Sequence, residues 1–170
     1  EAKNVVAAMQ GYRCFRQLSA LSGAATNKIR GMFAGKDDDG NAALYVGDSA
    51  KLYKMNASTS ALTDLSKGGG YSSAAGKARR FAQFGEAIIA TNFSDAMQTN
   101  TVASGSAFAD LTGTPPRAHF ITVVRDQVMV ANTHDSTDGN KPYRIWWSGI
   151  NSHTSWTPGT ALSDYQDVAD

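Results

Sequence analysis

The amino-acid sequence predicts an all-β fold, and two observations carry that prediction. Charged residues make up only 18% of the 170 residues, whereas the 16 glycines and the many serines, threonines and asparagines favour turns. Apolar residues recur at every second position in several short runs, which is the period of a strand and not of a helix. The length is sufficient for one domain with a substantial core.

The first segment, residues 1–28, predicts an N-terminal arm or lead-in. It has little periodicity, and Gly11 and Gly23 mark turns within it. The segment is therefore expected to be an extended arm, or a short strand followed by a loop.

Three β-hairpins are predicted from Ile29 onward. Each joins two runs of β-branched, aromatic and alternating residues across a short polar turn. The hairpins pair "IRGMFA" with "AALYVG", "RRFAQF" with "AIIAT", and "HFITVV" with "QVMVAN", starting at Ile29, Arg79 and His119.

A further strand and a closing segment follow each hairpin. The closing segments of the first two units match, as "LTDLS" from Leu62 and "FADLT" from Phe108. In the third unit "TSWTP" is the closing segment, and Trp156 occupies the position equivalent to Leu62 and Phe108. The units lie near residues 29–70, 79–116 and 118–160.

These units are about 50 and then about 40 residues apart, with three or four strands each, which is typical of β-propeller blades. Closed propellers have about four to eight blades. Residues 29–170 are therefore expected to form a partial propeller of about three blades, as part of a larger ring. The alternatives are a sandwich of about seven to nine strands and an open stack of sheets capped by a neighbouring subunit.

Motifs that could carry chemistry are better explained by structure. Asp37–Asp39 precede a glycine between two apolar runs, as in a hairpin turn, and the ligand spacing of an EF-hand is missing. "KGGGY", residues 67–71, lacks the Lys-Ser/Thr of a phosphate loop and predicts an inter-blade linker. Arg79 and Arg80 are expected on opposite faces of one strand.

Neither catalysis nor metal binding is predicted. His119, His134 and His153 do not match a metal-ligand spacing. No serine has the local signature of a nucleophile, although a triad assembled in space leaves no trace in the sequence. We therefore expect a protein that is not an enzyme, with no catalytic, cofactor-binding or metal-binding residue and no cofactor.

The charge and cysteine content exclude further classes. The net charge of +1 does not favour tight DNA binding or a polybasic membrane contact. No apolar run approaches the roughly 18 residues that span a bilayer, so no membrane contact is predicted. Cys14 is the single cysteine, which rules out an intrachain disulfide.

All three tryptophans lie in "RIWWSGINSHTSWTPG", residues 144–159. Exposed Trp147 and Trp156 could stack on sugar rings. In the structural interpretation, which we favour, residues 145–147 form a strand, Ser148 and Gly149 begin a turn, and Trp156 folds back onto the core.

This segment, with "RRFAQFGEAIIATNFSDAMQ", "FADLTGTPPRAHFITVVRDQVMVAN" and the opening "NVVAAMQGYRCF", resembles a family of bacteriophage virion proteins. The family comprises the tail nozzle or tail-hub proteins of short-tailed phages (tail tubular protein B-like), in which an R-x-x-W-S-G-I-N-D-P-x-x-W segment ends a blade. Ser152 and His153 stand here in place of its Asp-Pro.

The resemblance implies a structural protein of the virion tail, assembled in the cytoplasm of the host bacterium. Copies of the chain would form a ring, a hexamer by family resemblance, between the adaptor and portal and the distal tail proteins. DNA would pass through its channel without sequence-specific binding, and the ring would retain or guide it at ejection. The alternatives are a carbohydrate-binding or glycosidase-like propeller of a tail-associated protein and a propeller that only binds other proteins.

Overall fold

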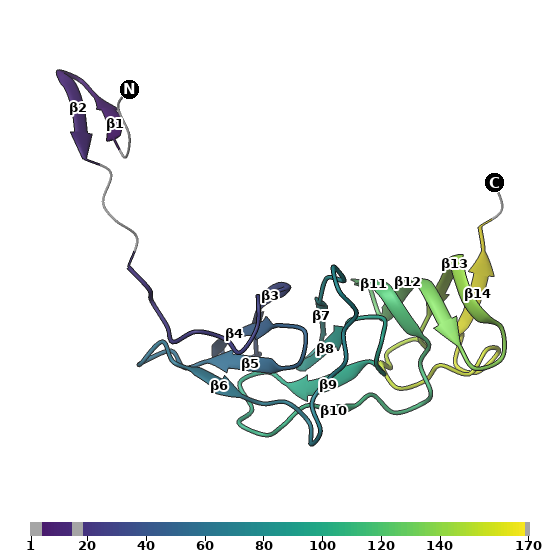
Figure 1. The fold of residues 1–170 in the computed structure, drawn as a ribbon. Coiled ribbons are helices and arrows are strands. Elements are labelled where there is room, and N and C mark those ends of the chain that lie inside the picture. Colours follow the sequence, from purple (N-terminus) through teal and green to yellow (C-terminus); the bar gives the residue numbers. More distant parts are fainter. Residues whose placement is uncertain (1–4, 15–18, 169–170) are drawn as a thin grey trace.

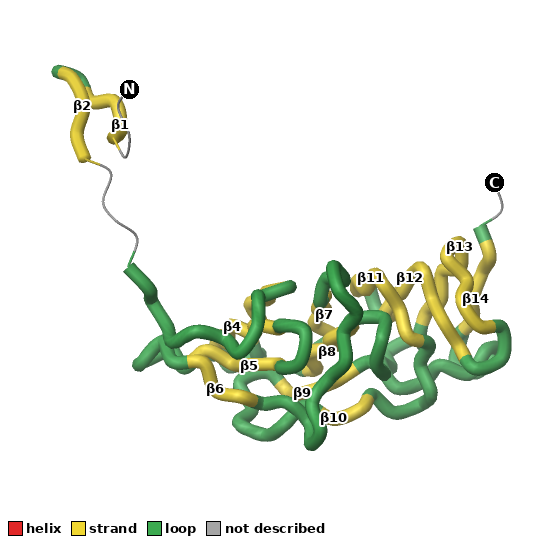
Figure 2. Tube along the Cα trace, in the orientation of Figure 1, coloured by secondary structure: helices red, strands yellow, loops and turns green. Residues whose placement is uncertain are grey.

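The computed structural model describes residues 5–14 and 19–168, and every regular element in these ranges is a β-strand (Figures 1 and 2). The predicted all-β class is thereby confirmed.

A two-stranded hairpin comes first, made of β1 (Val5–Ala8) and β2 (Gly11–Cys14). It lies apart from the other sheets (Figure 1). Residues 1–4 and 15–18 of the predicted lead-in lie outside the described residues. The remainder of the lead-in contacts the first large sheet, since the backbone N–H of Thr26 donates to the Tyr53 hydroxyl at 3.0 Å.

Three antiparallel sheets of four strands follow, and in each one every strand pairs with the next along the chain. The first sheet contains β3 (Gly31–Lys36), β4 (Ala42–Gly47), β5 (Leu52–Met55) and β6 (Leu62–Asp64). The second contains β7 (Arg80–Phe84), β8 (Ala87–Thr91), β9 (Gln98–Thr101) and β10 (Ala109–Asp110). The third contains β11 (Arg117–Val124), β12 (Gln127–Asp135), β13 (Gly139–Trp147) and β14 (Asp164–Asp167).

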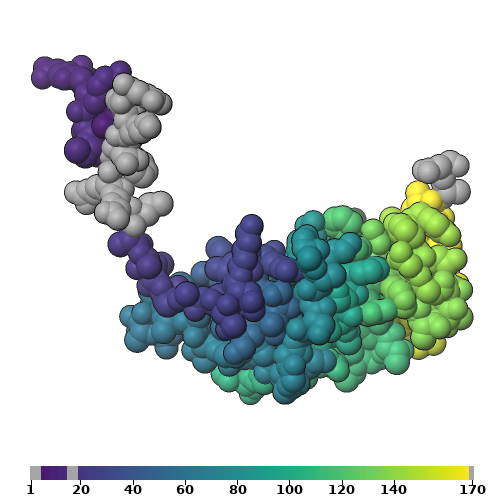
Figure 3. Space-filling view, viewed as in Figure 1, coloured from purple at the N-terminus to yellow at the C-terminus, as the bar shows by residue number. Residues whose placement is uncertain are grey.

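The sheets stand in a row, in the order of the sequence (Figures 1 and 3). The described strands thus form three large sheets, not the two of a sandwich. The three predicted hairpins are present as β3–β4, β7–β8 and β11–β12.

The core consists of two apolar layers, one between each pair of neighbouring sheets. Between the first and second sheets, Phe33 stacks on Phe81 with ring centroids 6.2 Å apart, and Tyr45 meets the edge of Phe108 at 5.8 Å. Between the second and third sheets, the layer joins Ile89, Met97 and Leu111 to Ala118, Val128, Val130, Trp146 and Trp156. Each sheet therefore needs its neighbour to bury its face.

The matching motifs "LTDLS" and "FADLT" perform the same task in the first two sheets. The backbone N–H of Leu65 donates to the Leu52 carbonyl at 2.9 Å, and that of Leu111 donates to the Met97 carbonyl at 2.7 Å. Both leucines are buried, at 4% and 5% exposure. Each one closes its sheet and fills the layer shared with the next sheet.

The third closing segment is not where the sequence predicts it. Trp156 lies in the connection between β13 and β14, whereas Val168 makes the equivalent bond, to the Tyr143 carbonyl at 2.9 Å. The third sheet accordingly runs past the predicted end of its unit at residue 160, because β14 closes it. Trp156 resembles a closing residue in the sequence because it is large, apolar and buried, but it reaches the core from a loop.

Candidate functional site

The first strands of the three sheets lie next to one another, since β7 contacts both β3 and β11. Basic residues precede or begin each of these strands: Arg30 before β3, Lys77 and Arg80 at β7, and Arg117 at β11. The fold thus gathers basic side chains that are far apart in the sequence along one end of these strands.

Phe93, in the connection between β8 and β9, is the centre of this group. Its backbone has a positive φ of 67°. Its ring stacks on His119 with centroids 3.9 Å apart and meets His134 edge-on at 6.4 Å. The Lys77 ammonium lies 5.8 Å from the Phe93 centroid and 3.3 Å from Nε2 of His119. One aromatic side chain therefore joins two of the three histidines.

Two arginines extend the group on β7 and β11. The Arg117 guanidinium donates to the Ser94 carbonyl and lies 2.9 Å from Nδ1 of His134. The Arg80 guanidinium lies over the ring of Phe120, 4.6 Å from its centroid. We call this set the basic–aromatic cluster: Lys77, Arg80, Phe93, Arg117, His119, Phe120 and His134.

The positive charge of the cluster rests on Lys77, Arg80 and Arg117. Within residues 5–14 and 19–168, no carboxylate forms an ion pair with any of these three. Burial, followed by the charges of Lys77 and Arg80, lowers the pKa of His119 below its ordinary value, so this imidazole is neutral at pH 7.

These side chains are better suited to binding a phosphate backbone than to catalysing a reaction. Guanidinium and ammonium groups bind phosphate oxygens, and exposed rings offer stacking surfaces to bases. The cluster contains no hydroxyl or thiol that an imidazole could activate. It is therefore a candidate contact surface for a polyanion.

The other end of the same strands carries more acidic than basic residues. The turns after β3, β7 and β11 carry Asp37–Asp39, Glu86 and Asp126, whereas Lys36 and Arg125 are the basic residues there. Residues 37–41 form the predicted turn, in which Asp37 accepts from the backbone N–H of Asn41 at 2.7 Å. The side-chain amide of Asn41 also donates to Asp37 and lowers the pKa of that carboxyl. Basic residues are thus in the majority at one end of the first strands, and acidic residues at the other.

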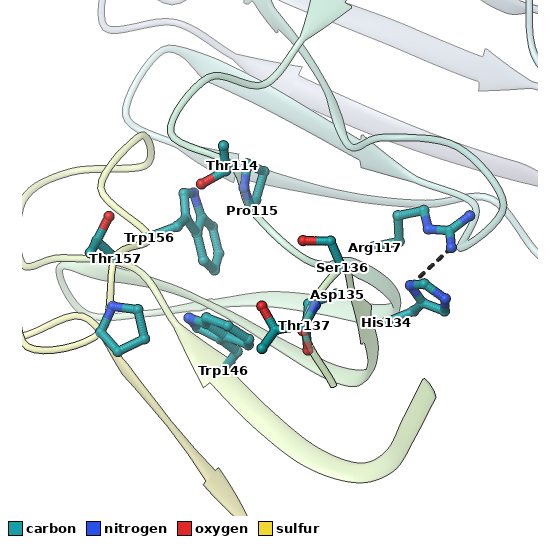
Figure 4. Close-up of a pocket in the computed structure, with 11 residues that line it drawn as sticks. Thr114, Pro115, Arg117, His134, Asp135, Ser136, Thr137, Trp146, Trp156 and Thr157 are labelled. Carbon is teal, nitrogen blue, oxygen red and sulfur yellow. Dashed lines mark hydrogen bonds between the residues drawn. The ribbon is translucent and has the colours of Figure 1, made fainter. Parts of the chain in front are cut away.

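A cleft of about 450 Å³ opens beside the cluster (Figure 4). Trp146 and Trp156 line it but are only 8% and 1% exposed, since both belong to the layer between the second and third sheets. Arg117 and His134 stand at its other side. The structural interpretation of Trp156 is confirmed, because its indole is packed in the core and donates to the His153 carbonyl at 2.7 Å.

The remaining sequence candidates occupy separate places. His153 packs on Phe84 at 5.8 Å, and burial lowers its pKa. Arg79 is buried and lies over the Tyr71 ring, whereas the guanidinium of Arg80 lies over the Phe120 ring, in agreement with the predicted opposite faces. Residues 67–71 form a turn that links the first sheet to the second.

One set of ion-paired residues could not be predicted from any pattern in the sequence. Arg144 is 3% exposed and pairs with Asp138 at 2.5 Å, Asp167 at 2.6 Å and Asp135 at 3.4 Å. Its guanidinium also lies 3.9 Å from the Tyr165 centroid. The hydrogen bonds that its guanidinium donates to Asp167 and Asp138 raise the pKa of Arg144. The group joins β12, β13 and β14, and each nitrogen of the Arg144 guanidinium has a carboxylate partner, which indicates a structural role.

Neither the protein-family models nor the curated proteins contain a match to this chain. No group of three or more potential metal ligands occurs among the side chains that the structure describes. In the same part of the chain, no helix is long and apolar enough to cross a membrane.

Proposed function

We propose that the chain is a structural protein of a bacteriophage tail. In this proposal it belongs to a nozzle or hub ring below the connector, forms part of the DNA conduit, and retains or guides DNA at ejection. The observation that carries the proposal is the row of three sheets packed face to face. Their first strands lie side by side, and the basic–aromatic cluster lies at one end of these strands.

The sheet order supports a propeller arrangement. In β-propellers, four-stranded antiparallel sheets are arranged around a central channel. Here β3, β7 and β11 are neighbours, as expected of the strands nearest a channel. Further sheets of the same kind would complete the ring.

The cluster supports a passing contact with DNA and not a tight one. Each phosphate contact strengthens nonspecific binding and adds to its salt dependence. Lys77, Arg80 and Arg117 pair with no carboxylate in the part of the chain that the structure describes, and the net charge is only +1. This combination allows weak binding that does not impede passage. By resemblance, the partners are copies of this chain in a hexamer, the adaptor and portal, and the distal tail proteins.

The burial of the tryptophans makes the carbohydrate alternative less attractive. A sugar platform needs an exposed ring face, whereas Trp146 and Trp156 are almost fully covered. Trp147 is half-buried, and its indole N–H donates to the Leu162 carbonyl at 2.9 Å. We therefore keep the proposal of a protein that is not an enzyme.

Fluorescence anisotropy with a labelled double-stranded DNA tests this proposal. We expect weak binding at low salt that falls steeply as salt rises and does not depend on sequence. Replacing Lys77 and Arg80 by alanine should reduce affinity about tenfold or more, whereas the control Arg125→Ala with Lys141→Ala should change it little. The absence of binding at low salt, or turnover of bacterial polysaccharide by the chain, would overturn the proposal.

A further inference from the structure

Two imidazoles of the basic–aromatic cluster accept hydrogen bonds from cationic side chains. The ammonium of Lys77 lies 3.3 Å from Nε2 of His119. The guanidinium of Arg117 lies 2.9 Å from Nδ1 of His134, as the dashed line in Figure 4 shows. Charged lysine and arginine side chains only donate, so each of these ring nitrogens must present a lone pair and not a proton. Both contacts therefore require a neutral imidazole.

The groups around His119 are positive or aromatic. Lys77 and Arg80 reach it from β7 and the segment before it, and Arg117 lies two residues earlier on its own strand. The Phe93 ring covers one face of the imidazole, with centroids 3.9 Å apart. Burial, followed by the charges of Lys77 and Arg80, lowers the pKa of His119. A proton on this ring is thus added to a group of like charges.

The surroundings of His134 do not offset a second charge either. Arg117 faces it from β11, and β13 places the uncharged Asn140 opposite it. Asp135 follows it on β12, but this carboxylate already accepts from two backbone N–H groups of the next turn and pairs with Arg144 at 3.4 Å. An external anion is therefore the partner that a protonated cluster lacks.

We propose that the cluster binds a phosphate backbone more tightly when His119 and His134 are protonated. Each proton adds one positive charge and removes the acceptor that occupies Lys77 or Arg117. The ammonium and one edge of the guanidinium then become free to donate to phosphate oxygens. Tighter binding follows from both effects, because each neutralised phosphate strengthens the nonspecific contact.

The rest of the cluster can stay in place during this change. Arg117 still donates to the Ser94 carbonyl at 2.9 Å through its other terminal nitrogen. The imidazolium of His119 keeps its position on the face of Phe93, because an aromatic face attracts a cation. Protonation thus alters the charge and the free donors of the surface and leaves its framework intact.

The effect is reciprocal, because the binding of protons and of the polyanion is linked. A bound phosphate backbone stabilises the imidazolium and raises the pKa of His119 above its value in the free protein. Affinity should therefore rise as the pH falls from the pKa of the bound state to that of the free state. This pH dependence rests on the DNA contact in the proposed function and adds the regulation of that contact.

Neutral replacements of matched shape test the proposal. His119→Gln and His134→Asn each keep an acceptor oxygen near the bonded ring nitrogen, but neither side chain can take up a proton. The two changes are combined in one double variant. His153→Gln is the matched control, since His153 packs on Phe84 outside the cluster. Circular dichroism at each pH checks that all chains remain folded.

Fluorescence anisotropy with labelled double-stranded DNA is measured at constant ionic strength between about pH 7.5 and about pH 5.5, the range in which imidazoles titrate. Affinity should rise at least about tenfold in the unmodified chain and in His153→Gln, and less than about twofold in the double variant. At the lower pH, the slope of log affinity against log salt should steepen by about one to two in the unmodified chain, and not in the double variant.

The possible failures can be told apart. A flat pH profile in the unmodified chain, or an equal rise in the double variant, would overturn the inference and leave the DNA contact in place. Absence of binding at every pH would overturn both. If the double variant does not fold, NMR titration of the unmodified chain decides: the pKa of His119 should be higher with DNA than without it, and equal values would overturn the inference.

Discussion

Replacing Leu111 by alanine should destabilise the protein far more than replacing Val168, although both residues close a sheet through the same backbone bond. Leu111 fills the layer between the second and third sheets and is 5% exposed, whereas Val168 is 50% exposed. The comparison therefore isolates the effect of the sheet that covers the closing residue.

The expected magnitudes follow from burial. Truncating a buried leucine removes its transfer free energy and leaves a cavity, at a total cost of about 3 kcal/mol in the free energy of unfolding. In a chain of this length that lowers the melting temperature by about 6–12 °C. Val168→Ala in the monomer should cost less than about 0.5 kcal/mol, because water already covers half of the side chain.

Urea unfolding followed by tryptophan fluorescence measures both changes at protein concentrations where the chain is monomeric. Leu65→Ala is the matched control in the first layer and should behave as Leu111→Ala does, since it is 4% exposed. Equal destabilisation by Leu111→Ala and Val168→Ala would refute the assignment of these residues to covered and uncovered sheet faces.

Three other perturbations test separate contacts. Gly113→Ala should cost more than about 1 kcal/mol, because φ is +85° and a Cβ would meet the Thr154 carbonyl, while Gly105→Ala, in open space, should be nearly neutral in thermal melts. Arg144→Gln should cost about 2 kcal/mol in urea. Its partner Asp167 has a lowered pKa, so stability is lost below about pH 4, and this loss should shrink in Arg144→Gln. NMR titration should give His119 a pKa below 6.5 that rises in Lys77→Ala. Because the pKa of His119 is lower in the folded than in the unfolded chain, stability should fall as the pH drops from about 6.5 to the folded-state pKa. An unchanged pKa of His119 in Lys77→Ala would contradict the cluster.

The strand pattern could be predicted well, because alternation and turn residues are local. The runs "AALYVG" and "AIIAT" coincide with β4 and β8. The closing segment of the third sheet could not be placed. Asp167-Val168 repeats Asp64-Leu65 only in its backbone bond, and the long connection that contains Trp156 stands between.

The basic–aromatic cluster could not be predicted either, because it is assembled from separate elements. Lys77 precedes β7, Phe93 follows β8, and His119 belongs to β11. Phe93 has a positive φ, which is not a strand conformation, so the alternating pattern of the neighbouring strands does not predict where its side chain points. Only the packing of the second sheet on the third brings the three together.

Electron microscopy of the chain at high concentration tests the central claim most directly. The account predicts closed rings with an open central channel, built from copies of this chain. Images that contain only monomers, or open strings that never close, would contradict it.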